Sequence, residues 1–291
     1  MKVVTWNIQY SKGRDERYDL LRIAGTVAGA DVIALQEVER HWPRTAMVDQ
    51  PAELGRLLPG YHWVYGPAFD VAVTDDPPNG RRCQFGTMLM ARLPILSARL
   101  HLLPLFASVN IFNIQKGALE GVVTTPRGPL RLYSVHLGHL AVEERLTQLM
   151  ALSEIVHAGD RENGPWTGPM AAPGTEWAFS GRVPPPGEHF VVLGDFNFTP
   201  DDPEYAHAAA STPSWGRQTI YRHRGFVDAW SVAGEGGATC FANPAARTSR
   251  DVRIDYAFVN GALATRVRRA WVDREADGSD HQPYWIEVDL G

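Results

Sequence analysis

Side chains that can bind a metal ion or transfer a proton recur where apolar, strand-like runs of this sequence end. The set contains two asparagines, two histidines and four carboxylates: Asn7, Glu37, His136, Asp195, Asn197, Asp255, Asp280 and His281. Oxygen-rich donor sets of this kind suit hard cations such as Mg²⁺ or Mn²⁺. A His–Asp pair adds a group whose pKa suits the activation of water near neutral pH.

Each position also has an ordinary explanation. A polar residue at a strand end commonly forms a turn or a solvated cap, and Gly194-Asp195 alone is consistent with a hairpin. His139, three residues after His136, is interpreted as a loop histidine, because this spacing gives no geometric support for a ligand pair at a strand end. The chemical interpretation therefore depends on the whole set rather than on any single member.

The residues of this set fall into six short blocks. The blocks are Thr5-Trp6-Asn7-Ile8, Leu35-Gln36-Glu37-Val38, Ser134-Val135-His136-Leu137, Leu193-Gly194-Asp195-Phe196-Asn197, Arg253-Ile254-Asp255-Tyr256 and Ser279-Asp280-His281. They resemble the signature blocks of the endonuclease/exonuclease/phosphatase superfamily and occur in the order found there. Because they extend from residue 5 to residue 281, the resemblance covers nearly the whole chain.

The resemblance implies a four-layer α/β/β/α sandwich of two packed mixed sheets with outer helices. It also implies a divalent-metal site at one edge of the paired sheets. Glu37 would be the principal ligand of Mg²⁺ or Mn²⁺, assisted by Asn7 and Asp280. Whether one or two ions bind is left open.

The same resemblance implies catalytic roles for the other residues of the set. His281 would be held by Asp255 and would activate water or steady the scissile phosphate. Asp195 and Asn197 would position the attacking water and a phosphate oxygen, while His136 would contact the phosphate or protonate the leaving oxygen. Either Asp195 or His281 could be the general base, and the two are treated as coupled.

The elements that must position these residues are mostly strands. Apolar runs rich in Val, Ile and aromatic residues predict strands at Lys2–Ile8, Asp31–Val38, Tyr61–Tyr65, Phe85–Ala91, Leu119–Thr124, Leu130–His136, Phe190–Leu193, Val252–Val259, Arg266–Val272 and Tyr284–Val288. Helical periodicity occurs only in residues 20–28, in Ala141–Ala158 and between Pro51 and Gly60. Many strands with few helices favour two packed sheets covered by helices over an alternating βαβ array.

The chain is predicted to form a single domain over residues 1–291. Two segments, Asp70–Arg82 and Gly159–Glu188, are predicted to be long loops because they are rich in Pro or Gly. They are not interpreted as linkers between domains, because a predicted strand follows each of them. Cys83 and Cys240 are interpreted as two ordinary thiols.

Composition restricts the partners. With 28 basic and 33 acidic side chains the formal charge is −5, which argues against a protein that coats nucleic acid. The first residues do not form a secretory signal, and no apolar stretch approaches the roughly 20 residues of a membrane span. A cytoplasmic monomer without a transmembrane segment is therefore expected.

Local features offer limited information about the substrate. Lys116 lies in a segment, Gln115–Leu119, that resembles a region carrying basic substrate contacts in bacterial relatives. Arg81-Arg82 adds local positive charge. The unusually apolar Leu105–Ile114 segment is predicted to pack as a buried loop, in preference to entering a lipid surface.

These observations favour a metal-dependent phosphodiesterase or phosphatase acting on a small or lipid-derived phosphoester. An endonuclease or exonuclease acting on DNA or RNA is the alternative, and nucleic acid is not the favoured partner. A binding module without catalysis is disfavoured because Glu37, Asp280 and His281 are all present.

Overall fold

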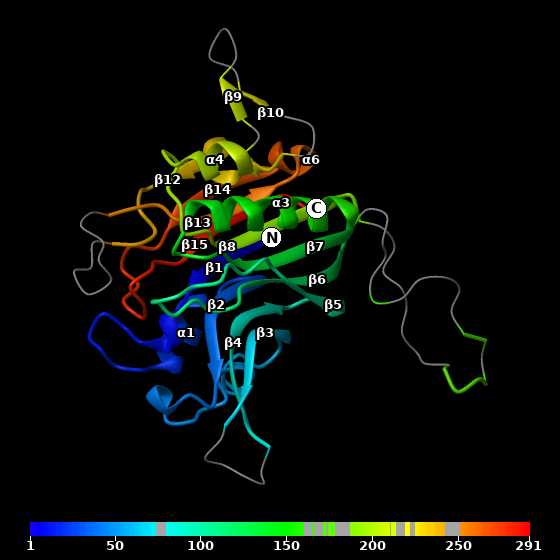
Figure 1. Ribbon diagram of the computed structural model, residues 1–291. Helices are drawn as coiled ribbons and strands as arrows, with labels where there is room; N and C mark the ends of the chain where they lie inside the picture. The colour runs from blue at the N-terminus through cyan, green and yellow to red at the C-terminus, as the bar shows by residue number, and fades with distance from the viewer. Residues whose placement is uncertain are drawn as a thin grey trace.

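Two sheets packed face to face form the centre of the computed structural model (Figure 1). The structure describes residues 1–73, 80–159, 165, 171–172, 174–177, 187–209, 211–213, 219–221, 225–241 and 251–291.

The first sheet has seven strands in the order β12-β14-β15-β1-β2-β4-β3. They span Lys2–Asn7 (β1), Val32–Arg40 (β2), His62–Ala72 (β3), Arg82–Ala91 (β4), Gly234–Glu235 (β12), Val267–Val272 (β14) and Tyr284–Val288 (β15). The central pair β1–β2 is parallel, and both neighbouring pairs, β1–β15 and β2–β4, are antiparallel.

The second sheet has six strands in the order β11-β13-β8-β7-β6-β5. They span Ile95–Leu102 (β5), Gly117–Thr125 (β6), Gly128–His136 (β7), His189–Asp195 (β8), Val227–Asp228 (β11) and Asp255–Val259 (β13). Its central pair β7–β8 is also parallel. Two short strands, β9 (Ser211–Pro213) and β10 (Thr219–Tyr221), pair separately.

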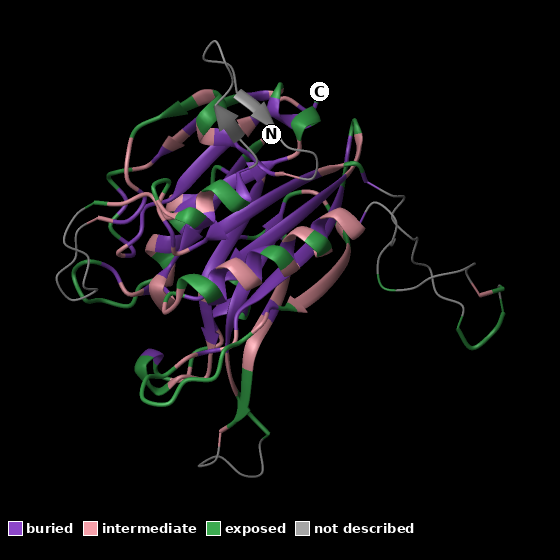
Figure 2. Ribbon diagram, turned by 45° about the horizontal axis from the view of Figure 1, so that its top comes forward, coloured by how far each residue is buried: buried purple, intermediate pink, exposed green. Residues whose placement is uncertain are grey.

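The alternation of side chains along the strands creates three apolar layers. Val3 and Val191 belong to the cluster between the two sheets, whereas their sequence neighbours Val4 and Val192 face outward. The outward face of the first sheet packs against α1 (Leu20–Val27) and α2 (Gln50–Leu57), and that of the second against α3 (Val142–Ala158). In Figure 2 the central strands of both sheets are largely buried, while edge strands and α3 include intermediate and exposed residues.

Short helices complete the described chain. They are η1 (Gln9–Ser11), η2 (Pro43–Thr45), α4 (Pro203–Ala208), α5 (Ala229–Ala233) and α6 (Gly261–Ala264). Within the residues that the structure describes, none of the helices is long and apolar enough to cross a bilayer.

The predicted fold class is confirmed: two mixed sheets are packed together and covered by helices. The ten predicted strands are all present, nine with shifted ends and Tyr284–Val288 with the predicted ends, but β5 and the short strands β9 to β12 were missed. The sequence of β5 interrupts apolar residues with Arg99 and His101, which both contact Glu120 of β6 at 2.9 Å. Contacts with the next strand therefore specify β5 more clearly than its own composition does.

The predicted loop Asp70–Arg82 is shorter in the structure. Asp70 pairs with Gln84 and Ala72 with Arg82, so both ends of this segment belong to a long β3–β4 hairpin. Residues 74–79 lie outside the described residues. Most of the predicted Gly159–Glu188 loop is outside them as well.

Gly194 allows the closest backbone approach beside the site. Its φ is +152°, and a Cβ atom there would lie 1.9 Å from the carbonyl oxygen of Val135 on β7. We therefore expect Gly194→Ala to lower the free energy of unfolding by about 3 kcal/mol or more, because β7 and β8 would have to separate. Urea unfolding followed by circular dichroism measures this change.

The matched control is Gly25→Ala on the exposed face of α1, where a Cβ atom would meet nothing within 4 Å. Alanine favours a helix over glycine by about 0.8–1 kcal/mol, so this variant should be slightly more stable than the natural protein. Equal stability of Gly194→Ala and the natural protein would show that the β7–β8 contact tolerates a side chain.

Candidate active site

The site lies where rows of inward-facing side chains reach the ends of the central strands. On β1 the row Val3, Thr5 continues to Asn7, and on β8 the row Val191, Leu193 continues to Asp195. Because the period of a strand is two residues, these polar ends face the same way as the apolar residues before them. The space between the sheets therefore changes from apolar to polar at this edge.

Strand register brings the polar ends together. His136 of β7 is the register partner of Asp195 of β8, and Asp195 is in turn the partner of Asp255 at the start of β13. From the other sheet, Asn7 donates a hydrogen bond from Nδ2 to Asp195 Oδ2 at 2.9 Å. Residues 188 positions apart in the sequence thus form a direct contact across the two sheets.

Glu37 reaches the site through an irregularity in β2. The pairing of β2 with β4 shifts between Leu35 and Val38, and Glu37 has a φ of +58°. Such a bulge redirects the side chain, and a left-handed glutamate is uncommon and strained. Glu37 Oε1 accepts a hydrogen bond from Asn7 Nδ2 at 3.2 Å, and the side chain is 21% exposed.

Asp280 is joined to this group through Gln9. Gln9 Nε2 donates to Asp280 Oδ2 at 2.8 Å, while the backbone N–H of Gln9 donates to Asn7 Oδ1 at 3.0 Å. Ser279 Oγ donates to the carbonyl oxygen of Asn7 at 2.7 Å, which fixes the segment before His281 against the end of β1. Neither Gln9 nor Ser279 was predicted to contribute to the site.

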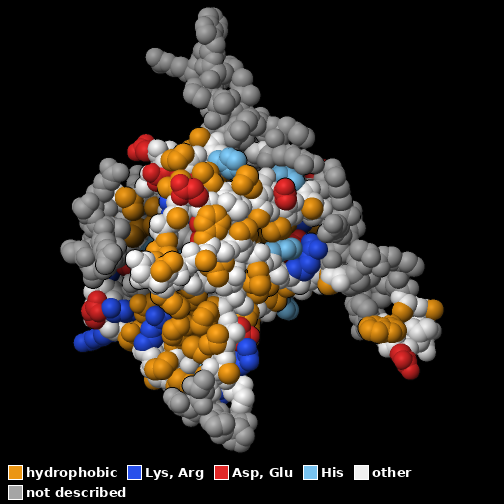
Figure 3. All heavy atoms as spheres, in the orientation of Figure 1, with side chains coloured by type: hydrophobic (Ala, Val, Ile, Leu, Met, Phe, Trp, Pro, Cys, Tyr) orange, Lys and Arg blue, Asp and Glu red, His pale blue; other side chains and the backbone are white. Residues whose placement is uncertain are grey.

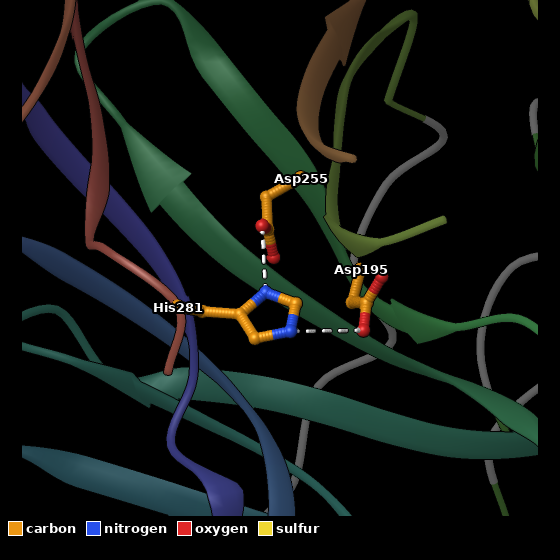
Figure 4. Close-up of side chains that lie close together, drawn as sticks. All are labelled: Asp195, Asp255 and His281. Atoms are coloured by element: carbon orange, nitrogen blue, oxygen red, sulfur yellow. Dashed lines mark hydrogen bonds and ion pairs between the residues drawn. The ribbon is translucent and has the colours of Figure 1, made fainter. Parts of the chain in front are cut away.

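His281 lies between two carboxylates (Figure 4). Its Nδ1 is 2.8 Å from Asp255 Oδ2, and its Nε2 is 3.9 Å from Asp195 Oδ2. Burial alone would lower the pKa of His281, but the charge and hydrogen bond of Asp255, with Asp195, raise it well above its ordinary value. These contacts favour the protonated form of the imidazole.

The pKa of the Asp195 carboxyl group is also perturbed. Burial, together with the nearby negative charges of Asp255 and Glu37, raises the pKa of its carboxyl group to about 7, although His281 and Asn7 act to lower it. A carboxyl group with such a pKa can exchange a proton near neutral pH. The geometry thus places a proton-accepting group and a cationic histidine side by side.

Lys116 and His136 form the other side of the site. Lys116 is 4% exposed and its Nζ lies 3.0 Å from Nε2 of His136, which is itself 3.6 Å from Asp195 Oδ2. Burial lowers the pKa of Lys116, and burial followed by the Lys116 charge lowers the pKa of His136 well below its ordinary value. His136 is consequently neutral at pH 7.

Asn197 is held in a left-handed turn directly after β8, with a φ of +55°. Its backbone N–H donates to Asp195 Oδ1 at 2.9 Å, and its Nδ2 donates to the carbonyl oxygen of Leu137 at 3.1 Å. The turn therefore fixes the second oxygen of Asp195 and links the ends of β7 and β8.

A buried polar layer lies one step beneath the site and was not predicted. Gln36 Nε2 donates to Ser134 Oγ at 3.0 Å, and Ser134 Oγ donates to the carbonyl oxygen of Leu35 at 3.2 Å. Thr5 Oγ1 also donates to Gln36 Oε1 at 3.3 Å. The only sequence signal was that polar residues occupy positions that face the apolar core.

Comparison with known proteins identifies the family of this chain. A sequence model of the endonuclease/exonuclease/phosphatase family matches residues 4–281. The chain belongs to this family. Members of the family are phosphoester hydrolases. No curated protein matches the sequence.

Solved structures show the same fold at low sequence identity. An endonuclease/exonuclease/phosphatase from Beutenbergia cavernae is 23% identical with a TM-score of 0.66, covering 100% of this chain and 72% of that one. A mannosyl-6-phosphatase from Bacteroides thetaiotaomicron is 16% identical with a TM-score of 0.64, covering 99% of both chains. A 3′ phosphatase from Neisseria, bound to a product DNA hairpin, is 18% identical with a TM-score of 0.56, again covering 99% of both.

Two groups in this family member have donors that could hold a cation. Oxygen or nitrogen atoms of Asp195, Asp255 and His281 all lie within 4.8 Å of one another, but Nδ1 of His281 is engaged by Asp255, which raises the pKa of the ring. A ring that keeps its proton does not bind a metal. Glu37 offers a partly exposed carboxylate outside this group.

The structure brings together all nine predicted site residues, directly or through Gln9. The linked set is Asn7, Glu37, Lys116, His136, Asp195, Asn197, Asp255, Asp280 and His281. Their individual roles remain predictions.

Other residues considered from the sequence lie outside this set. His139 is exposed, and Arg82 pairs with Asp70 at 2.6 Å. Cys83 and Cys240 are free thiols.

The Asp255–His281 pair supports a prediction with two readouts. Asp255→Asn removes the main influence that raises the pKa of His281, so burial should then lower that pKa; NMR titration of the ring measures it. The kcat/KM for a phosphoester should fall by roughly 100-fold or more in Asp255→Asn and in His281→Ala.

The double variant should lose little more than either single variant, because residues that act as one unit are strongly non-additive. Thermal melts establish that each variant is folded. Losses that multiply in the double variant, with an unchanged His281 pKa in Asp255→Asn, would show that the two residues act independently.

Proposed function

We propose that this protein is a divalent-metal-dependent hydrolase of phosphate esters, and that its substrate is a small or lipid-derived phosphoester, either a diester or a monoester. The observation that carries the proposal is the opposition of charges in one site. Carboxylates from both sheets, Glu37 and Asp195, lie beside the cationic His281 and the buried Lys116. Phosphoryl transfer requires this combination of positioning and charge neutralisation.

The residues present fit a hard cation. Glu37 offers a partly exposed carboxylate and Asp280 a second one, and Mg²⁺ commonly uses one or two carboxylates while keeping several waters. Asn7 directs Nδ2 toward Glu37 while its oxygen accepts from the N–H of Gln9, so its amide would have to rotate to bind the same ion. When bound, Mg²⁺ or Mn²⁺ would neutralise charge on the phosphate oxygens. In the proposal Glu37 is the principal ligand, with Asn7 and Asp280 in support.

Asp195 and His281 would handle the proton of the attacking water. Asp195, with a pKa of about 7, can accept this proton, and Asn197 keeps its other oxygen in place through the backbone N–H. His281, kept cationic by Asp255, can donate a hydrogen bond from Nε2 to a phosphate oxygen or to Asp195. The pair therefore works as one coupled unit.

Lys116 and His136 would bind the phosphate and the leaving oxygen. Both are buried, so a phosphate that contacts them is attracted more strongly than it would be in open solvent. His136 is neutral and can donate or accept a hydrogen bond, while Lys116 supplies the nearby donor. In this proposal Lys116 is a substrate-binding residue and His136 a catalytic one.

A small or lipid-derived substrate is favoured over nucleic acid by the charge of the chain, which is −5. On the face seen in Figure 3, Lys and Arg side chains form small separate groups among larger hydrophobic and neutral areas. Duplex-binding proteins usually carry a continuous basic surface. The nuclease alternative is supported by the similar fold of the Neisseria 3′ phosphatase that is bound to a DNA hairpin.

Glu37→Gln tests the metal site. The change keeps the size of the side chain and removes its charge, so Mg²⁺ affinity measured by calorimetry should fall. Turnover of bis-p-nitrophenyl phosphate should drop by roughly 100-fold or more. Because the backbone at Glu37 is already strained, unfolding must be measured for the same variant.

Glu143→Gln is the matched control, since Glu143 is exposed in the first turn of α3. This variant should retain the natural Mg²⁺ affinity and turnover. Full activity and unchanged affinity in Glu37→Gln would remove Glu37 from the metal site.

A substrate screen tests the choice between the two substrate classes. Purified protein with Mg²⁺ or Mn²⁺ is offered bis-p-nitrophenyl phosphate, inositol phosphates, sphingomyelin, RNA, and nicked and single-stranded DNA. We expect the highest kcat/KM for a small or lipid-derived phosphoester. A kcat/KM for DNA or RNA that exceeds all others by tenfold would favour the nuclease, and no hydrolysis with either metal would reject the proposed activity.

A further inference from the structure

The loop between β5 and β6 exposes apolar side chains beside the candidate active site. Leu105–Ile114 was predicted to be buried, and only Ile114 at its end is. Phe112 is 68% exposed, Ile111 is 52% exposed and Val109 is fully exposed. The prediction of a buried loop is therefore wrong, because no neighbouring element among the described residues covers this segment.

The exposed loop is nevertheless held in place at its base. The buried carboxylate of Glu144 on α3 accepts hydrogen bonds from the backbone N–H of Phe106 at 2.9 Å and from Asn113 Nδ2 at 2.8 Å. Gln148 Nε2 donates to the carbonyl oxygen of Pro104 at 2.9 Å, and Leu103 N donates to Lys116 O at 3.0 Å. These contacts fix where the loop projects without covering its apolar side chains.

Two side-chain hydrogen bonds lie within the loop, and its other contacts are to α3 and to the ends of β5 and β6. Asn113 Nδ2 also donates to the carbonyl oxygen of Phe106 at 3.2 Å, and Ile111 N donates to Ser108 Oγ at 3.3 Å. Over Leu102–Gln115 the sequence contains no Asp, Glu, Lys, Arg or His. A loop without charged side chains can enter the headgroup region of a membrane without the cost of desolvating an ion, and headgroups and water there can bond its remaining backbone groups.

The loop leads directly into the site. Phe112 precedes Lys116 by four residues, so the two Cα atoms are at most about 14 Å apart even if the chain is fully extended. Lys116 in turn contacts His136 at 3.0 Å. A lipid surface that received Phe112 and Ile111 would therefore lie within a short distance of the site residues Lys116 and His136.

We propose that this loop inserts its exposed apolar side chains into the headgroup region of a lipid surface, so that the enzyme takes a phosphoester held in that surface. The complete lack of charge favours a lipid over a protein partner, since the rims of protein interfaces are polar. Because the loop carries no basic side chain, its insertion should not require anionic headgroups, and neutral lipid should suffice. This inference rests on the proposed function for the substrate class, but lipid binding itself can be measured without turnover.

The experiment is flotation of the full-length protein with vesicles of phosphatidylcholine alone. The variant Ile111→Ser/Phe112→Ser should reduce partitioning into vesicles by roughly tenfold or more, because two exposed apolar side chains no longer enter the lipid. Leu21→Ser, which removes a 67% exposed side chain from α1, is the matched control and should partition as the natural protein does. Both variants should hydrolyse soluble bis-p-nitrophenyl phosphate at the natural rate.

Several outcomes would overturn the inference. The natural protein could fail to float with phosphatidylcholine vesicles, or the loop variant could float equally well. Sedimentation showing a dimer that the loop variant converts to a monomer would instead make the loop a contact between two copies of the chain. Failure of the proposed phosphoesterase activity is distinguishable, because it would appear as absent hydrolysis of soluble substrate with vesicle binding intact.

Discussion

The side-chain hydrogen bond between Gln36 and Ser134 joins the two sheets directly beneath the site, and the arrangement above it depends on that contact. The two residues are 98 positions apart and lie on the central parallel pairs of opposite sheets. Their hydrogen bond fixes the separation and lateral position of β2 and β7 where the apolar core ends. Only with this registration can Asn7 of one sheet reach Asp195 of the other at 2.9 Å.

Burial of so many charged groups in one place is costly, and the site offsets the cost by pairing them. Asp255 is fully buried, and one of its oxygens has no hydrogen-bond partner among the described residues, yet its other oxygen faces a cationic His281. Removing either partner would leave an uncompensated charge in an apolar setting. The perturbed pKa values of Asp195 and His281 are therefore consequences of the same burial that brings the residues together.

Other buried ion pairs hold the surrounding elements at fixed positions. Arg145 of α3 contacts Glu204 of α4 at 2.7 Å, and Arg253, just before β13, contacts Asp228 at the end of β11 at 2.8 Å. The second pair lies two residues from Asp255, so it restrains the strand end that orients His281. The candidate site is thus supported from several elements, whereas the apolar β5–β6 loop is restrained only at its base.

The sequence by itself determined which residue types stand at the strand ends, because strand periodicity and apolar runs are local properties. From these it was possible to predict two packed sheets, helices close to α1, α2 and α3, and the set from Asn7 to His281. The direction of the Glu37 side chain was decided by the tertiary structure alone, since it depends on a bulge in the pairing of β2 with β4 and on a φ of +58°. It also decided that Gln36 and Ser134 bond across the sheets and that Phe112 is exposed. Register, cross-sheet contacts and exposure depend on neighbours that are distant in sequence, and no local pattern specifies them.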